Sequence, residues 1–221
     1  MINTGRAFDR LVNFSDAVVA VAITVLALSI VDIRGTNSEQ SVWQIIDDNS
    51  SKIVTFLFTF VVVAVMWRVH NRIFDCMRGY DAPIFWLNLL WLCAIVFLPW
   101  PSALYGEGGG VGPGATNDGV LPGAPLLYWG TLAVISLAGG LISQRVNTHP
   151  DLIDPEFAQA VHTPMRGYLF ALIFLIIGLV SLVSLEIAAW LPLAMIPLAI
   201  AIKKWEQHQA GKANVRSGES S

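Results

Sequence analysis

The chain alternates between long apolar runs and short polar connections. A helix crosses a bilayer core of about 30 Å with about 20 mostly apolar residues. Each long run is apolar on all sides, whereas a helix of a soluble protein carries one apolar stripe. The pattern therefore predicts an all-α, polytopic membrane protein with six transmembrane helices, at residues 13–33, 53–70, 83–104, 124–143, 167–185 and 187–205.

These spans are expected to form a single transmembrane domain, residues 1–205, followed by a cytoplasmic tail at 206–221. The tail ends in Gly and Ser, and we expect it to be disordered. The polar segment 34–52 is expected to hold a short surface helix, and the segment 106–123, rich in Gly and Pro, a flexible loop.

Composition narrows the functional class. Hydrophobic residues make up 55% of the chain and charged residues 13%, against about 25% charged in a typical soluble domain. The net charge is −3 and the basic residues form no stripe, which excludes a nucleic-acid partner. Cys76 and Cys93 lack the spacing of a metal or redox site. We expect no metal and no cofactor.

The basic residues predict the orientation. One end of the predicted bundle carries only two basic residues, Arg34 and Lys52. The opposite end carries the remaining eleven: Arg6, Arg10, Arg68, Arg72, Arg78, Arg145, Arg166, Lys203, Lys204, Lys212 and Arg216. The positive-inside rule then places both termini in the cytoplasm. This placement requires an even number of spans, and six satisfies it. The expected location is the plasma membrane.

Ionisable and polar groups inside predicted spans are rare, and each is a candidate functional residue. Asp16 opens the first span shortly after Arg10, His70 closes the second one turn after Trp67, and Asn88 lies in the third. Two interpretations are open. The five residues form one network, with Arg10 paired to Asp16 and His70 joined to Trp67 and Asn88, or each is a separate snorkelling residue.

One face of the first predicted helix is a second candidate. Val21, Thr24 or Val25, and Leu28 recur at helical spacing. Periodicity alone favours ordinary packing for this face. If it lined a symmetric pore, it would supply apolar rings that gate by dewetting and one hydroxyl ring from Thr24.

Three motifs resemble one known family. The run from Arg10 to Asp16 reads R-x-x-x-F-S-D, with Phe14 and Ser15 in the motif. It looks like the opening of the first helix in the transmembrane protein 175 family of endolysosomal potassium channels and their bacterial homologues. Trp67-Arg68-Val69-His70 resembles the family's W-x-x-H element, and Asn88 followed by L-P-W-P-S at 98–102 resembles its third helix.

The resemblance implies a potassium-selective cation channel without a carbonyl filter. Its subunits would form a homotetramer in the lipid bilayer, with the first helix around a path for potassium ions. By family analogy Val21 forms the hydrophobic constriction and Thr24 a selectivity-linked ring. Val21 is smaller than the usual isoleucine or leucine, so Val25 or Leu28 could be the narrowest ring. The expected structural network comprises Arg10, Phe14, Ser15, Asp16, Trp67, His70 and Asn88.

Other functions remain as alternatives. A secondary transporter would show an inverted repeat and ionisable groups near the membrane midplane, and the sequence shows neither. An enzyme would need a nucleophile with its base or a metal cluster. The loop with His149, His162, Asp151, Asp154 and Glu156 reads better as a solvated loop. A non-conducting membrane subunit is a further alternative.

Because no span carries a ladder of basic residues, we expect no voltage gating.

Overall fold

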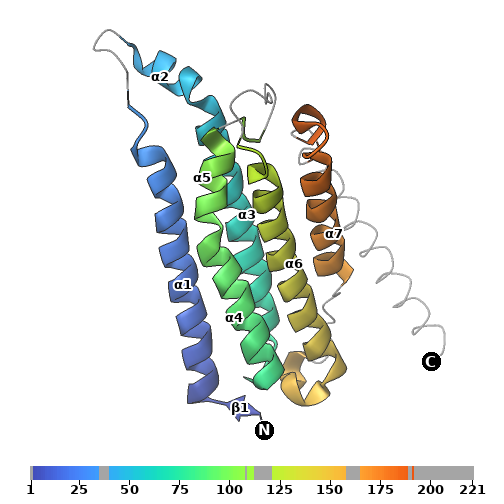
Figure 1. The fold of residues 1–221 in the computed structure, drawn as a ribbon. Helices are drawn as coiled ribbons and strands as arrows, with labels where there is room; N and C mark the ends of the chain where they lie inside the picture. Colours follow the sequence, from blue (N-terminus) through green and yellow to red (C-terminus); the bar gives the residue numbers. More distant parts are fainter. Residues whose placement is uncertain are drawn as a thin grey trace, which may run out of the picture.

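The chain folds into a bundle of long helices that run side by side (Figure 1). The computed structural model describes residues 2–34, 40–107, 109–111, 121–157, 165–188 and 191. Its helices are α1 (Arg6–Val31), α2 (Val42–Asp48), α3 (Ser50–Asp75), α4 (Ala82–Phe97), α5 (Pro99–Glu107), α6 (Ala124–Thr148) and α7 (Met165–Val180), with 3-10 turns at Pro150–Leu152 and Pro155–Phe157. Two short strands, β1 (Asn3–Thr4) and β2 (Gly79–Tyr80), pair at the end where α1 begins.

Four helical segments of the described residues are long and apolar enough to cross a membrane: α1, α3, α4 with α5, and α6. The protein is thus a mostly helical, multi-pass membrane protein. The predicted fifth span coincides with α7, which has only 16 residues. The predicted sixth span and the tail lie almost wholly outside the described residues, so the count of six stays a prediction.

Three of the spans extend by more than one helical turn beyond an end that hydropathy predicted. α1 begins at Arg6 rather than near residue 13, α3 continues to Asp75 rather than 70, and α6 continues to Thr148 rather than 143. The extra turns carry polar residues, most of them exposed, such as Arg6, Arg10 and Arg72. A window that scores only hydropathy cannot detect such turns, because they are polar and depend on tertiary contacts such as the bond from Arg145 to Asp81.

Two prolines interrupt the third span. Pro99 and Pro101 have no N–H to give to the carbonyl four residues earlier, and α4 therefore ends at Phe97 while α5 begins at Pro99. The chain direction is kept because Leu98 N–H bonds to Ala94 O at 3.1 Å and Ser102 N–H bonds to Leu98 O at 3.0 Å.

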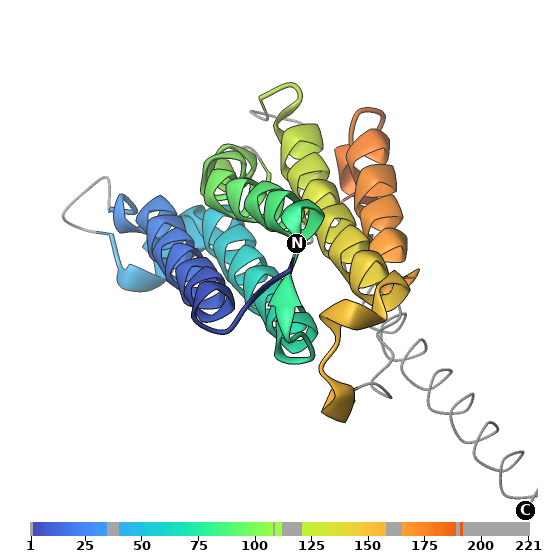
Figure 2. The ribbon, with the colours of Figure 1, turned by 90° about the horizontal axis from the view of Figure 1, so that it is seen from below.

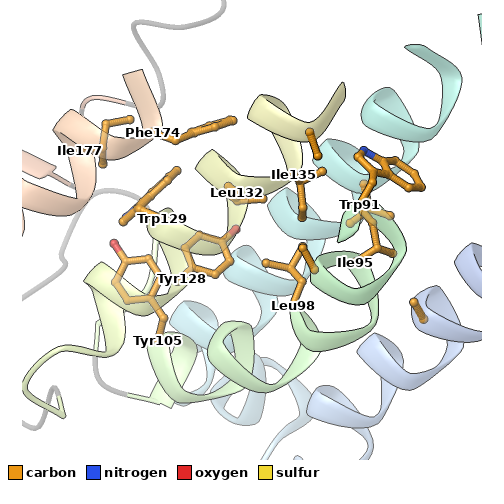
Figure 3. Packing of buried hydrophobic residues seen from close by; sticks show 14 of the residues in the cluster. Trp91, Ile95, Leu98, Tyr105, Tyr128, Trp129, Leu132, Ile135, Phe174 and Ile177 are labelled. Atoms are coloured by element: carbon orange, nitrogen blue, oxygen red, sulfur yellow. The ribbon is translucent and has the colours of Figure 1, made fainter. Parts of the chain in front are cut away.

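Large aromatic side chains fill the centre of the bundle (Figure 3). Trp129 of α6 is fully buried; its ring lies 5.9 Å from that of Phe174 on α7 and 5.0 Å from that of Tyr128. Tyr105 of α5 closes the same cluster. These contacts hold α5, α6 and α7 together.

α6 and α7 approach each other most closely at a pair of glycines. A Cβ on Gly167 would lie 2.5 Å from the Cα of Gly140, which no real contact permits. Small residues allow this kind of backbone approach between membrane helices, where packing replaces the hydrophobic effect as the source of association. In both ribbon views α1 lies at the opposite edge of the bundle from α7 (Figures 1 and 2).

Asp81 joins the start of α4 to the end of α6. Its Oδ1 accepts the Ile84 N–H at 3.1 Å, which caps α4, and its Oδ2 accepts Arg145 Nη2–H at 2.8 Å and Nε–H at 3.1 Å. Burial alone would raise the pKa of Asp81. The bonds from Arg145 and Ile84 and the guanidinium charge outweigh it and hold the pKa below its ordinary value of 3.8.

Replacing Asp81 should remove a pH-dependent stabilisation. Asn keeps the helix cap, so Asp81→Asn isolates the bond to Arg145, and we expect it to lower the free energy of unfolding by about 1–2 kcal/mol at pH 7. A depressed folded-state pKa stabilises the fold above the unfolded pKa, and the effect is lost as pH falls through the folded value. The difference in detergent melting temperature should therefore shrink below about pH 4.

The matched control is Glu156→Gln, which removes an exposed carboxylate. It should leave the melting temperature unchanged at both pH values. An Asp81→Asn protein that melts like wild type at pH 7, or whose deficit persists undiminished at pH 3, contradicts the assignment.

Candidate functional site

α1 has one face on the bundle and one face free of its own chain. The face on the bundle carries a stripe at helical spacing: Leu11, Ser15, Val19, Ala22 and Leu26 are all buried. The opposite face carries the four residues predicted to line a pore: Val21, Thr24, Val25 and Leu28, all exposed. Val21 is 60% exposed and Leu28 59%, against 2% for Val19. The described chain thus covers none of the four.

The hydroxyl of Thr24 is already engaged by its own helix. Its Oγ1–H donates to the carbonyl of Val21 at 2.7 Å. A hydroxyl has one proton to donate and two lone pairs that accept. Because the proton is used along the helix, the lone pairs of Oγ1 remain available on the exposed face to a cation or to water.

A chain of buried hydrogen bonds attaches the buried face of α1 to the bundle. Ser15 Oγ–H donates to Leu11 O at 2.9 Å, and Ser15 Oγ accepts Asn88 Nδ2–H at 2.9 Å. Asn88 Oδ1 then lies 2.8 Å from His70 Nε2. The chain links α1, α4 and α3 through side chains that are all buried. Three of the residues predicted for the network, Ser15, His70 and Asn88, therefore meet.

The directions of these bonds assign the proton of His70. Ser15 gives its own proton to the backbone, so it must accept from the Asn88 amide, and this orients the amide with Oδ1 toward His70. Oδ1 is only an acceptor, so His70 Nε2 carries the proton. The ring of His70 lies between those of Phe74 and Trp91, with centroid distances of 4.3 and 4.2 Å.

Asp16 contacts Trp67 and not Arg10. Trp67 Nε1–H donates to Asp16 Oδ1 at 2.8 Å, which joins α3 directly to α1 on the partly exposed side of the His70 chain. Arg10 is exposed, and no ion pair joins it to Asp16. Phe14 is also exposed. The pairing of Arg10 with Asp16 that we expected is replaced by the indole, which reaches across from α3.

A second polar node lies farther along the bundle, and it was not predicted from the sequence. Thr59 Oγ1 on α3 donates to Thr55 O, and lies 3.0 Å from Ser102 Oγ and 2.8 Å from the Tyr128 hydroxyl. The node joins α3, α5 and α6. The available signal was a pair of threonines four residues apart inside an apolar run, with each one alone typical of any span.

The described acids and histidines of the loop after α6 show no metal-binding cluster. Among the described residues no group of three or more His, Cys, Asp or Glu side chains is close enough to hold a metal ion. His149 instead bonds the carbonyl of Arg145, and Asp154 receives the N–H of Glu156. His162 lies outside the described residues.

Residues 10–99 match the family model described as the endosomal/lysosomal potassium channel TMEM175. These residues contain the first two motifs, the start of the third up to Pro99, and every residue of the buried hydrogen-bond chain. Over these residues, the chain is similar to the TMEM175 family. The family is one of ion channels and not of enzymes.

Two curated relatives show the breadth of the TMEM175 family. A potassium channel of Streptomyces collinus is 31% identical over 98 residues, which cover 44% of this chain and 47% of the relative. The endosomal/lysosomal proton channel TMEM175 of Danio rerio is 28% identical over 151 residues, covering 68% of this chain and 27% of the relative. The chain thus spans about half, or about a quarter, of the length of these relatives.

The fold is that of a solved TMEM175 homologue. The crystal structure of a lysosomal potassium-selective channel TMEM175 homologue from Chamaesiphon minutus superposes with a TM-score of 0.70 at 24% identity. The match covers 89% of this chain and 98% of that one. It extends the likeness well beyond residues 10–99, and at this identity it concerns the fold alone.

Removing the central amide of the buried chain should destabilise the protein. Asn88→Leu keeps the size of the side chain but leaves the His70 Nε2–H buried without an acceptor. An unsatisfied buried donor costs about 1–3 kcal/mol, so we expect a lower melting temperature in detergent, followed by circular dichroism.

Asn13→Leu is the matched control, because Asn13 lies exposed on the opposite side of α1. It should melt like wild type. Equal melting temperatures for the two variants would show that the Ser15–Asn88–His70 chain contributes nothing to the fold.

Proposed function

We propose that the chain is one subunit of a potassium-selective cation channel whose pore is lined by α1. The observation that carries this proposal is the exposed apolar face of α1, on a helix whose other face is held by buried hydrogen bonds. The family description and the bacterial relative, which is named a potassium channel, support the choice of ion.

One copy of α1 cannot enclose a path for ions. Several copies arranged around a closed symmetry axis would turn Val21, Val25 and Leu28 into stacked apolar rings. Such rings close a pore to ions by excluding water, and they open it with a small widening. We expect a homotetramer. The constriction would be the narrowest of these rings.

The ring at Thr24 would provide the selectivity. Potassium channels without a backbone carbonyl filter need another set of oxygens that replaces part of the ion's hydration shell. Thr24 is the only hydroxyl among the four residues, and its lone pairs face away from the helix that takes its proton. The ring would lie between the apolar rings of Val21 and Leu28, one turn from each.

The end of the bundle where α1 begins would face the cytoplasm. Most of the described arginines lie at this end: Arg6 and Arg10 at the start of α1, Arg68 and Arg72 near the end of α3, and Arg145 near the end of α6. The opposite end carries Arg34 and Lys52. This asymmetry supports cytoplasmic termini in a plasma membrane.

Voltage should have little effect on such a channel. Between Arg10 and the end of α1 the only charged side chain is Asp16. A voltage sensor needs several charges that move through the field, each worth about 2.3 kcal/mol per 100 mV. Currents through the channel should therefore follow the driving force without a steep threshold.

Ion flux through purified protein in sealed vesicles tests the proposal. Wild type should pass potassium faster than sodium. Thr24→Ala should lower the ratio of the potassium rate to the sodium rate by about fivefold, as expected for the loss of roughly 1 kcal/mol of oxygen contact. Leu28→Ala should raise the potassium rate, because it widens an apolar ring. Leu172→Ala, on the exposed face of α7, is the control for the loss of an exposed leucine.

Proton flux is measured in the same vesicles, because the Danio rerio relative is named a proton channel. If protons cross the vesicle membrane and potassium does not, the protein is still a channel, but it conducts protons rather than potassium. Well-folded protein that passes neither ion, or α1 variants that behave like Leu172→Ala, would contradict the proposal. A transporter or a non-conducting subunit would then be favoured.

A further inference from the structure

Two short strands of the chain, β1 and β2, pair at the end of the bundle where α1 begins. β1 lies antiparallel to β2, with Asn3 opposite Tyr80 and Thr4 opposite Gly79. β2 lies in the turn between α3 and α4, so the strand pair joins the start of α1 to that turn (Figure 2). Two-residue strands are marginal alone, and their presence here requires other support.

The same turn is bound on its other side by the segment that follows α6. Met77 forms a β-bridge with Ile153. Arg78 N–H bonds to Leu152 O at 3.0 Å, and Arg78 Nε–H bonds to Asp151 O at 2.6 Å. We call the three segments together, residues 2–4, 76–81 and 151–154, the N-terminal clasp.

Gly79 is the tightest point of the clasp. A Cβ at this position would lie 2.5 Å from the carbonyl oxygen of Asn3 and 2.8 Å from Cγ2 of Thr4. The backbone of β1 thus approaches so closely that only a glycine fits without displacing it. A methyl group there would push β1 away from β2.

α1 follows the clasp almost directly. Only Gly5, with φ +59°, separates Thr4 from the first helical residue, Arg6. The first two turns of α1 are also packed: the ring of Phe8 stacks on that of Phe74 at 6.0 Å, and Leu11 is buried. The direction of α1 is therefore set by the clasp, in addition to the contacts along its buried stripe.

We propose that the N-terminal clasp holds α1 in its conducting position and so determines the fraction of channels that conduct. This proposal rests on the proposed pore function of α1. Thr4 and Val21 are 17 positions apart in the sequence, which is roughly 25 Å along a helix. A tilt of about 5° at the clasp would move the Val21 ring by about 2 Å, more than the rise of about 1.5 Å per helical residue. Thr24, which would select the ion, is not touched by the clasp.

Gly79→Ala tests this proposal, with Gly130→Ala as the matched control. Gly130 lies in α6, and a Cβ there would meet nothing within 4 Å. In Gly79→Ala we expect faster amide hydrogen exchange at Asn3, Thr4 and Tyr80, and a potassium flux about threefold or more below wild type, as a modest shift of population gives. The ratio of potassium to sodium rates should stay at the wild-type value. Gly130→Ala should match wild type in all three measurements.

Deleting residues 2–4 is the second variant, because it removes β1 without introducing a clash. It should reproduce the loss of flux with an unchanged ion ratio. The proposal is overturned if β1 is released, as exchange reports, while flux stays at the wild-type rate. It is also overturned if the ion ratio falls together with the rate, because the pore itself would then be damaged. If wild-type protein passes neither ion, the proposed function is contradicted instead. Flux through the wild-type vesicles shows this without any variant.

Discussion

The hydrogen-bond chain from Ser15 through Asn88 to His70 is the constraint on which the rest of the site depends. Buried polar groups in an apolar bundle must find partners, since each one left unpaired costs free energy. Shifting α1 by one residue rotates its side chains by about 100° and carries Ser15 away from Asn88. Only one rotation of α1 satisfies the chain, and that rotation leaves Val21, Thr24, Val25 and Leu28 free.

α6 and α7 are packed more closely within the bundle than α1 is, and this difference agrees with the proposed function. α6 and α7 meet at backbone contact through Gly140 and Gly167, and the aromatic cluster around Trp129 holds them to α5. α1 instead lies at one edge, with a single buried stripe and two polar contacts to α3 and α4. A rigid scaffold with one helix attached at its edge suits a protein in which that helix lines a path shared between subunits.

Much of this was predictable because a membrane makes hydropathy informative. The apolar runs located α1, α3, the α4–α5 pair and α6, and the rarity of polar groups in the spans singled out Asp16, His70 and Asn88. The ends of the helices were not predictable, since they depend on tertiary contacts such as Asp81 with Arg145. Arg10 does not pair with Asp16, although one interpretation of the sequence had it so; the partner is Trp67, which the family resemblance placed in the same network. The strands at Asn3–Thr4 and Gly79–Tyr80 leave no periodic signal at two residues each.

The central claim is that the free face of α1 meets water and not lipid. Cysteine accessibility tests it most directly, in a background with Cys76 and Cys93 replaced by serine and with a water-soluble thiol reagent on protein in vesicles. The account predicts reaction on the free face, at Val21→Cys, Thr24→Cys, Val25→Cys and Leu28→Cys, and none on the buried stripe, at Val19→Cys, Ala22→Cys and Leu26→Cys. Protection of all seven positions in folded protein would mean that the free face is covered by lipid or by a neighbouring helix, and would contradict a pore lined by α1.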